Sequence, residues 1–320
     1  MTRGFWRSQA HIHLKPGTRH LNYGFGLLRK KTKFSATDFF LSLLLLSAAG
    51  YAVYKINIGF SYKWNWGAIP QYFLRFDADL NRWVPNILLE GFLTTIRLSV
   101  WATIFATLIG TVMGLFRVSR SLFKRLIGGT YVEVIRNLPP LVIIFIFYFF
   151  VGDQILPLLG IEDFIRTSSE VTRAVVAVFL ARPPLLTAFV SALITLSLFE
   201  GAYITEIVRA GIQSIEKGQW EASAALGFSR WQQMRYIVLP QALQRILPPL
   251  AGQFISTIKD SAIVSVISIQ ELTFQAMELM SSTYLTFEIW ITITGMYLIL
   301  TLSCSLAVER LEIFMHKKTV

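Results

Sequence analysis

Four polar side chains interrupt two of the most apolar stretches of the chain, where they could bind a charged solute. Glu200 and Tyr203 are three residues apart, so a helix places them on one face. Lys259 and Asp260 lie within a later apolar stretch. Charged groups at membrane depth are costly and usually face a cavity or a partner. Two interpretations follow: a polar pocket halfway across a membrane, or interhelical ion pairs that fix the packing of helices.

The overall composition is that of a membrane protein. The chain is 54% hydrophobic and only 15% charged, with a mean hydropathy of +0.54, which is too apolar for a domain whose whole surface is wet. Cys304 is the only cysteine, so no internal disulfide can form. No segment has the pattern of a phosphate-binding P-loop. We therefore expect no nucleotide hydrolysis, no catalytic residues, no metal site and no cofactor in this chain itself.

The apolar runs predict an all-α integral membrane protein with about six transmembrane helices. Helices are required because every backbone donor and acceptor must be satisfied within its own segment in lipid. The first run is short, since its 16 residues extend about 24 Å at ~1.5 Å each. Glu206 and Arg209 approach the end of the fourth run and are expected to be structural. The six runs are residues 39–54, 88–116, 131–151, 185–212, 246–269 and 289–308.

The charges predict the orientation of these helices. The chain carries a net charge of +11, which fits a nucleic-acid partner, an anionic lipid surface or cytoplasmic loops. Most lysine and arginine falls in residues 1–37, 117–131, 213–245 and 309–320, and the alternate segments are neutral or acidic. Six crossings with both termini in the cytoplasm satisfy the positive-inside rule throughout. A lipid membrane is then the expected partner, and no nucleic acid.

Three regions follow from this organisation. Residues 1–37 form a basic cytoplasmic tail, in which His11 and His13 are too few ligands for a metal. Residues 38–85 form an extra transmembrane helix and an outer loop. Residues 86–320 form the main transmembrane domain, with a cytoplasmic loop at 213–240.

The cytoplasmic loop has the most specific pattern in the chain. Residues 221–240 predict two short amphipathic helices, separated by a turn at Gly227 that suits the left-handed backbone at a helix end. Ser229 is a plausible N-cap for the second helix, and Pro240 is expected to end it. One interpretation is a segment that lies at the membrane–water interface and only connects two spans. The alternative is a docking element, with Trp220 and Trp231 among its apolar anchors.

The spacing within this loop resembles the EAA loop of permease subunits in ATP-binding-cassette (ABC) importers. Glu221-Ala222-Ser223, then Gly227, then Ile237, Leu239 and Pro240 carry the resemblance, with Ser223 where the family usually has alanine. The flanking residues resemble the branch that imports polar amino acids, except that Glu216 stands where proline is common. The likeness covers roughly residues 86–310. The flanking motifs are Gly201-Ala202-Tyr203 with Glu206, Arg209, Gly211 and Ile212, Lys217-Gly218-Gln219-Trp220, Leu239 to Leu243, Pro248-Pro249-Leu250 and Lys259-Asp260-Ser261.

This resemblance implies a type I importer permease with a core of five helices plus one extra N-terminal helix, in a bacterial cytoplasmic (inner) membrane. It implies two separate ATPase subunits that bind ATP and magnesium, a second permease subunit that is identical or related, and an external amino-acid-binding protein. It also implies a coupling set of residues, which is Trp220, Glu221, Ala222, Ser223, Gly227, Arg230, Leu239 and Pro240. The candidates for the path, from their depth in the apolar stretches, are Glu200, Tyr203, Lys259 and Asp260, which could bind the ammonium and carboxylate of an amino acid or could instead fix helix packing.

Two other functions remain open at this point. An ion-coupled secondary carrier for amino acids would show inverted repeats between its halves, which are not visible in the sequence. A membrane-embedded scaffold or sensor with a nucleic-acid-binding tail would lose its function when residues 1–37 are deleted, whereas a transporter would keep it.

Overall fold

The computed structural model describes residues 35–59, 62–79 and 81–317. The predicted basic tail therefore lies almost wholly outside the described residues. The chain divides into two units, residues 1–63 and 64–320. In the first, α1 (Ala36–Gly59) is one helix whose apolar part is Ala36–Tyr51. Phe39 and Leu46 expose 67% and 71% of their surfaces, so α1 has no core of its own. Its crossing of a membrane stays a prediction.

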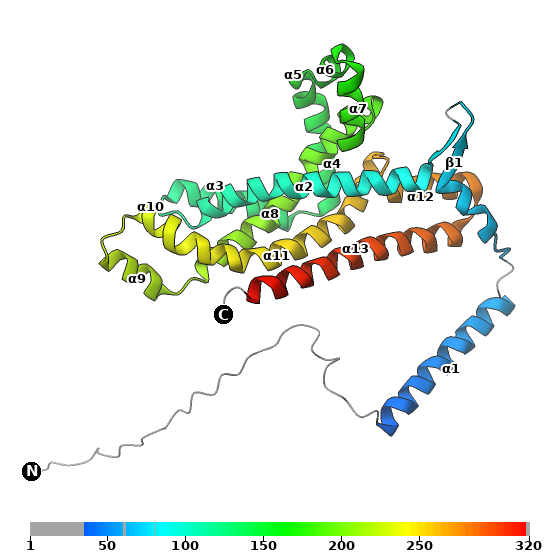
Figure 1. Ribbon diagram of the computed structural model, residues 1–320, viewed down its shortest axis with the longest axis horizontal. Helices are drawn as coiled ribbons and strands as arrows, with labels where there is room; N and C mark the ends of the chain where they lie inside the picture. Colours follow the sequence, from blue (N-terminus) through cyan, green and yellow to red (C-terminus); the bar gives the residue numbers. More distant parts are fainter. Residues whose placement is uncertain (1–34, 60–61, 80, 318–320) are drawn as a thin grey trace, which may run out of the picture. The chain divides into compact units, whose positions relative to one another are not determined.

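The second unit is a bundle built on long apolar helices. In the described part of the chain, four helical runs are long and apolar enough to cross a membrane, and a bent pair of helices raises the number to five. These runs fit the second to sixth predicted spans and confirm the helical fold class. Figure 1 shows α2, α8, α11 and α13 side by side. The four runs are Ile87–Arg117, Pro183–Gln213, Arg230–Ile267 and Thr286–Arg310.

A close contact between α2 (Ile87–Arg117) and α8 (Leu186–Gln213) forms the centre of the bundle. Gly110 and Gly114 lie against Ile204 and Val208, and a Cβ added at either glycine would come within 2.6 Å of its neighbour. Small residues at this spacing let helix backbones approach, as the GxxxG pattern predicts. The two helices therefore run in the same direction and in a fixed register.

The predicted third span is broken. α3 (Leu122–Asn137) and α4 (Pro140–Phe150) meet at an angle of 116°, at the point where the sequence analysis had assumed one continuous helix. Proline disfavours helical backbone in the residue before it, so Leu138 takes an extended conformation with ψ 150° and α3 ends. A π turn and short helices follow: η4 (Val151–Ile155), α5 (Leu156–Leu159), α6 (Ile161–Thr167), α7 (Glu170–Phe179) and η5 (Pro183–Leu185).

Pro240 does not end the second helix of the cytoplasmic loop, so this prediction was wrong. α10 (Arg230–Gln232), the π turn η6 (Gln233–Val238) and α11 (Leu239–Asp260) form one continuous run. A π turn resets the hydrogen-bond pattern. Pro240 thereby falls in the first turn of α11, where no backbone donor is needed. Pro248 and Pro249 also lie inside α11 without ending it.

The remaining elements lie beside these helices. The predicted outer loop contains η2 (Trp66–Ala68), η3 (Pro70–Tyr72) and a hairpin of β1 (Leu74–Asp77) and β2 (Arg82–Pro85), in which Leu74 pairs with Pro85. The sequence analysis missed this hairpin because its strands are only four residues long. After α11 come η7 (Ser261–Ile267), α12 (Leu272–Thr283) and α13 (Thr286–Lys317). The hairpin lies at one end of the bundle, and the end of α13 lies at the other, with α9 (Lys217–Ala225) and α10 (Figure 1).

Candidate functional site

The turn predicted within residues 213–240 is present in detail. Gly227 has φ +79°, the left-handed conformation that favours glycine. Ser229 caps α10 in a capping box, in which its backbone N–H donates to Oε1 of Gln232 over 2.8 Å. The side-chain amide of Gln233, which is buried, donates to the carbonyl of Phe228 over 2.9 Å. The turn between α9 and α10 is therefore fixed from both sides.

The eight predicted coupling residues divide between an inner and an outer face. Ser223 is buried, with its hydroxyl donating to the Trp220 carbonyl over 2.9 Å, and Trp220 packs on the core. Leu239 is half-buried in the helical run that follows. The outer face is exposed and combines charge with the apolar side chains of Leu226 and Trp231, which expose 76% and 67%. The predicted residues on the outer face are Glu221, Ala222, Gly227, Arg230 and Pro240.

Contacts between α8 and α11 hold the base of this loop, and the sequence analysis had not identified them. Arg245 donates a hydrogen bond to the carbonyl of Ser214, the residue that follows α8. Gly211 lies so close to Ile246 that an added Cβ would be 2.3 Å from its Cγ1. The two ends of the loop are thus joined, at the end of α8 and in α11.

Three of the four predicted path residues lie together between α8 and α11. The carboxylate of Glu200 is buried and accepts a hydrogen bond over 2.7 Å from the amide of Gln253, a residue that the sequence analysis missed. Glu200 also interacts with the carboxyl group of Asp260, and Tyr203 lies within electrostatic range of both carboxyl groups. Lys259 is exposed and interacts with Asp260.

Arg136 completes the environment of Tyr203. Its guanidinium lies 5.4 Å from the centre of the Tyr203 ring, a cation–π contact. Glu133 lies three residues before Arg136 and could pair with it on one helix face. Instead, Glu133 accepts a hydrogen bond from the amide of Asn137 over 3.0 Å. Arg136 therefore brings a positive charge from α3 to the polar pocket on α8.

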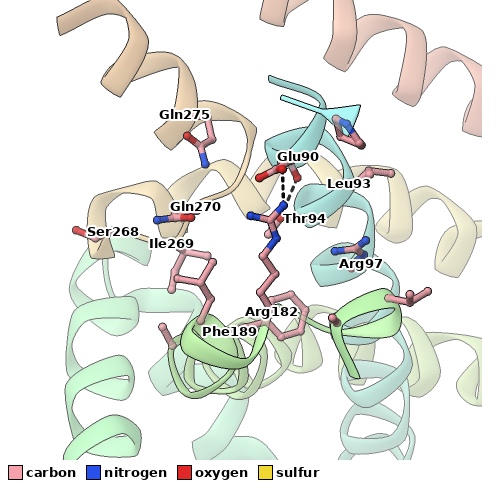
Figure 2. A pocket seen from close by; sticks show the side chains of 16 residues that line it. Glu90, Leu93, Thr94, Arg97, Arg182, Phe189, Ser268, Ile269, Gln270 and Gln275 are labelled. Carbon is pink, nitrogen blue, oxygen red and sulfur yellow. Dashed lines mark hydrogen bonds and ion pairs between the residues drawn. The ribbon is translucent and has the colours of Figure 1, made fainter. Parts of the chain in front are cut away.

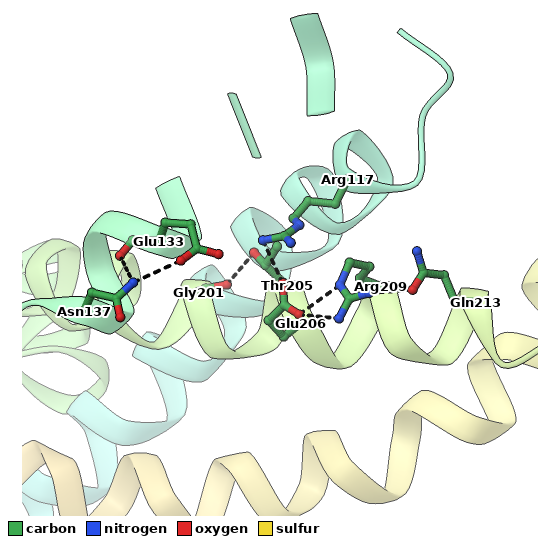
Figure 3. A network of polar contacts seen from close by, with 8 residues as sticks. All are labelled: Arg117, Glu133, Asn137, Gly201, Thr205, Glu206, Arg209 and Gln213. Atoms are coloured by element: carbon green, nitrogen blue, oxygen red, sulfur yellow. Dashed lines mark hydrogen bonds and ion pairs between the residues drawn. The ribbon is translucent and has the colours of Figure 1, made fainter. Parts of the chain in front are cut away.

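An ionic cluster lies at the end of the bundle nearest the loop (Figure 3). Oε2 of Glu206 pairs with Arg209 at 2.7 Å on the same helix, and Oε1 pairs with Arg117 at the end of α2 over 2.9 Å. Glu206 and Arg209 had been assigned a structural role, and the contact with Arg117 fits it. The cluster fastens α2 to α8.

Glu271 marks a second buried polar centre, at the start of α12. Its carboxylate accepts hydrogen bonds from the backbone N–H of Phe274 over 2.8 Å and from the hydroxyl of Tyr297, also over 2.8 Å. Burial raises the pKa of Glu271 above its ordinary value, and these hydrogen bonds act in the opposite direction. Glu271 follows the fifth predicted span, in one of the alternate segments that are neutral or acidic. The signal available in the sequence was the position of Glu271 directly before an apolar helix, where its side chain can cap the helix.

A bundle of apolar helices with a polar pocket inside and a helical loop at one end defines a multi-span membrane transport component. A family model described as "Binding-protein-dependent transport system inner membrane component" matches residues 106–317. The chain therefore belongs to that family of permeases.

Comparisons with individual proteins agree. The chain is 35% identical to the "Probable glutamine ABC transporter permease protein GlnM" of Bacillus subtilis, over 71% of this chain and 92% of the relative. It is 35% identical to the "Glutamine transport system permease protein GlnP" of Escherichia coli, over 71% and 91%. It is 30% identical to the "Glutamate/aspartate import permease protein GltJ" of E. coli, over 79% and 95%.

Two solved structures share the fold. "Crystal structure of an amino acid ABC transporter with histidines" contains a chain with a TM-score of 0.56 and 32% identity, covering 71% of this chain and 92% of that one. A chain of the inward-facing "MetNI methionine ABC transporter" has a TM-score of 0.53, with 72% and 96% covered, and at 19% identity it supports the fold alone. These findings favour an ATP-driven importer over the ion-coupled carrier.

Proposed function

We propose that this chain is the permease subunit of an ABC importer for polar amino acids, that it forms the translocation path, and that two separate ATPase subunits bind ATP and magnesium and hydrolyse ATP. The names of the relatives support the substrate class, since they include permeases for glutamine and for glutamate and aspartate. This chain hydrolyses nothing itself. A second permease subunit and an external amino-acid-binding protein complete the assembly.

The exposed face of the cytoplasmic loop is the observation that carries this proposal. Leu226 and Trp231 are apolar side chains left in the open on a polar segment, with Glu221 and Arg230 exposed nearby in the sequence. Exposed apolar side chains accompanied by charged ones are typical of a protein interface. The ATPase docks here, and its closure moves the loop.

The joined base of the loop explains how movement reaches the path. Arg245 fastens α11 to the residue after α8, and α10 continues into α11 without a break. Glu200 and Asp260 lie on these same two helices. A shift of the loop therefore alters the polar pocket, which opens in turn to each side of the membrane. Glu200, Tyr203, Lys259 and Asp260 are the path residues of this proposal.

The position of the described C-terminal end of α13 supports the proposed topology. The described end of α13 lies at the same end of the bundle as α9 and α10 (Figure 1). Both termini and the 213–240 loop then face the cytoplasm, and the hairpin of β1 and β2 faces outward. The basic residues 1–37 hold the orientation at the anionic leaflet.

Co-purification and uptake test this function. The full chain is co-expressed with the ATPase from its own operon, purified in mild detergent and reconstituted with the external binding protein. We expect the ATPase to co-purify and uptake of labelled amino acid to require ATP. Leu226→Asp should abolish both, while Leu158→Asp, at a leucine that is 85% exposed in α5, should leave both unchanged. Uptake that follows an ion gradient without ATP would overturn the proposal.

A further inference from the structure

A cavity of about 220 Å³ lies at the end of the bundle where α2 and α8 begin. One water molecule occupies ~30 Å³ in the liquid, so the cavity has room for a small organic solute. Its lining combines apolar residues such as Phe189 and Ile269 with two arginines, one glutamate and two glutamine side chains. Figure 2 shows these side chains converging from α2, from α8 and the segment before it, and from α12 and the segment before it.

The charges of the lining do not cancel. Glu90 and Arg182 form an ion pair across the cavity. Arg97 is the second cation, and within the described residues its guanidinium has neither a hydrogen bond nor an ion pair. It is half-buried, eleven residues into α2. An arginine offers a planar fork of donors that matches a carboxylate in two parallel hydrogen bonds. The lining thus carries one more positive than negative charge, and Arg97 is the cation without a direct partner among the residues that the structure describes, although it lies within electrostatic range of Glu90.

Gln275 offers a second unused polar group. It is only 7% exposed, and in the described part of the chain its side-chain amide forms no hydrogen bond. Figure 2 shows its amide end directed toward the cavity, across the Glu90–Arg182 pair from Arg97. The amide atoms of Gln275 are not among the fully buried unpaired polar atoms of the described residues, so they remain open to the cavity and can bind a solute. Gly91 lets α12 come this close, since a Cβ there would lie 2.9 Å from Cγ of Gln275.

The wall that carries Arg182 is held in place. The indole N–H of Trp101 on α2 donates to the carbonyl of Phe179 at the end of α7 over 2.9 Å. Arg182 follows three residues later and accepts a backbone hydrogen bond from Leu185 over 2.9 Å. The cavity is therefore a built site on three fixed elements and not a gap beneath a loose loop.

We infer that this cavity receives the α-carboxylate of an amino acid at Arg97 before the solute reaches the deeper polar pocket; this inference rests on the proposed function. The register of α2 against α8 brings Arg97 level with Ser191. Glu200 is nine residues further along α8, about 14 Å deeper at ~1.5 Å per residue. The outer site has an excess of positive charge, whereas the deeper pocket has both signs, with Glu200 and Asp260 near Lys259 and Arg136. The carboxylate end is therefore bound first at Arg97, and the ammonium end is bound later by the carboxyl groups of the deeper pocket.

Ligand binding to the purified permease–ATPase complex in nanodiscs, without the external binding protein, tests this inference. The probes are labelled L-glutamine, L-glutamate and L-arginine, each against its carboxamide, which lacks the α-carboxylate. The wild-type complex should prefer at least one acid over its amide by about ten-fold or more, as expected of hydrogen bonds to a charged group. Arg97→Gln should remove that preference, and Arg97→Lys should keep part of it.

A second variant covers the case in which Arg97→Gln fails to fold. Thr94→Asp places a carboxylate three residues before Arg97, on the same helix face, so that Arg97 is neutralised in place. It should remove the preference in the same way. Arg166→Gln removes an exposed arginine from α6 and should change nothing.

Several outcomes would overturn the inference. They are equal binding of acid and amide by the wild type, no binding of any probe, or a preference that survives both Arg97→Gln and Thr94→Asp. Failure of the proposed function is a separate result, since it would appear as absence of ATP-dependent uptake by the wild-type assembly.

Discussion

Glu206 of α8 and Arg117 of α2 form an ion pair of 2.9 Å at the end of the bundle nearest the cytoplasmic loop. The two side chains are 18% and 21% exposed, and the same carboxylate also binds Arg209. Pairs this far from water are weakly screened. The pair therefore joins two helices that otherwise meet through small residues.

Glu206→Gln should lower the stability of the permease. The substitution leaves two partly buried arginines without a counter-charge, at an expected cost of about 1–3 kcal/mol. We expect a lower melting temperature in detergent, measured by fluorescence-detected size-exclusion chromatography. Glu309→Gln, an exposed glutamate in α13, is the matched control and should have no effect. Equal melting temperatures of the two variants would show that the Glu206–Arg117 ion pair adds nothing to stability.

Gly227→Ala should weaken the coupling of ATP hydrolysis to transport. No atom lies within 4 Å of a Cβ at this position, so the substitution changes only the backbone preference at φ +79°. A left-handed conformation costs an ordinary residue about 1–2 kcal/mol. We expect a several-fold loss of ATP-dependent uptake with normal membrane insertion. Gly227→Asn is the control, because asparagine tolerates this conformation, and it should keep most of the uptake. Equal activity of the two variants contradicts the prediction.

Gly110→Ala and Gly295→Ala should have opposite effects on stability. The Cβ at Gly110 would lie 2.6 Å from Cγ2 of Ile204, so α2 must move away from α8. Overpacking of this kind costs about 1–3 kcal/mol. Gly295 has open space around it, and alanine favours a helix there by up to ~1 kcal/mol. Thermal melting of both variants in the same detergent checks the two signs, and a shift in the same direction would refute the packing argument.

Glu200→Gln should change the affinity for substrate more than the stability of the fold. Glutamine keeps a hydrogen-bonding side chain opposite Gln253 but removes the negative charge that an ammonium group would meet. We expect a higher KM for uptake with a similar melting temperature. Glu288→Gln neutralises another fully buried glutamate, which accepts from the backbone of Asn65 over 2.6 Å, and serves as control. An unchanged KM would favour a packing role for Glu200.

Glu271 should make stability depend on pH. Its pKa is raised in the folded state, so the folded protein binds this proton more readily than the unfolded chain does. The contribution of this group to stability is therefore present at low pH and is lost as pH rises from its ordinary value through the raised one. Glu271→Gln should flatten the rise in melting temperature seen as pH falls below neutral. Glu278→Gln, exposed on the same helix, should retain that rise.

Hydropathy predicted the helical bundle well, because five of the six apolar runs are long enough to be recognised as spans without knowledge of their neighbours. The hairpin was missed, since two four-residue strands carry too little pattern. The break at Pro139 and the continuation through Pro240 show a limit of local rules. A proline disturbs a helix differently according to the hydrogen-bond pattern around it, and a π turn is not visible in composition.

Sequence patterns found the residues of the candidate sites but not their partners. Gly227 and Ser229 have local signatures, so their turn was predicted correctly. Gln253, 53 positions after Glu200, became visible as its partner only in the folded chain. Arg97 escaped notice for the same reason, because an isolated arginine in an apolar run says nothing about which helices surround it.

The unbroken helical run from Arg230 to Ile267 has a mechanical consequence. Between Arg230 and Asp260 it extends on the order of 45 Å at ~1.5 Å per residue. A stiff rod of this kind has no joint at Pro240, so a tilt imposed at its foot is delivered to Lys259 and Asp260 at its far end. The run can bend at Pro248 and Pro249, where two backbone hydrogen-bond donors are missing. Replacing both prolines with alanine would restore the two backbone donors and stiffen the helix. The displacement of Lys259 and Asp260 for a given tilt at Arg230 would then change.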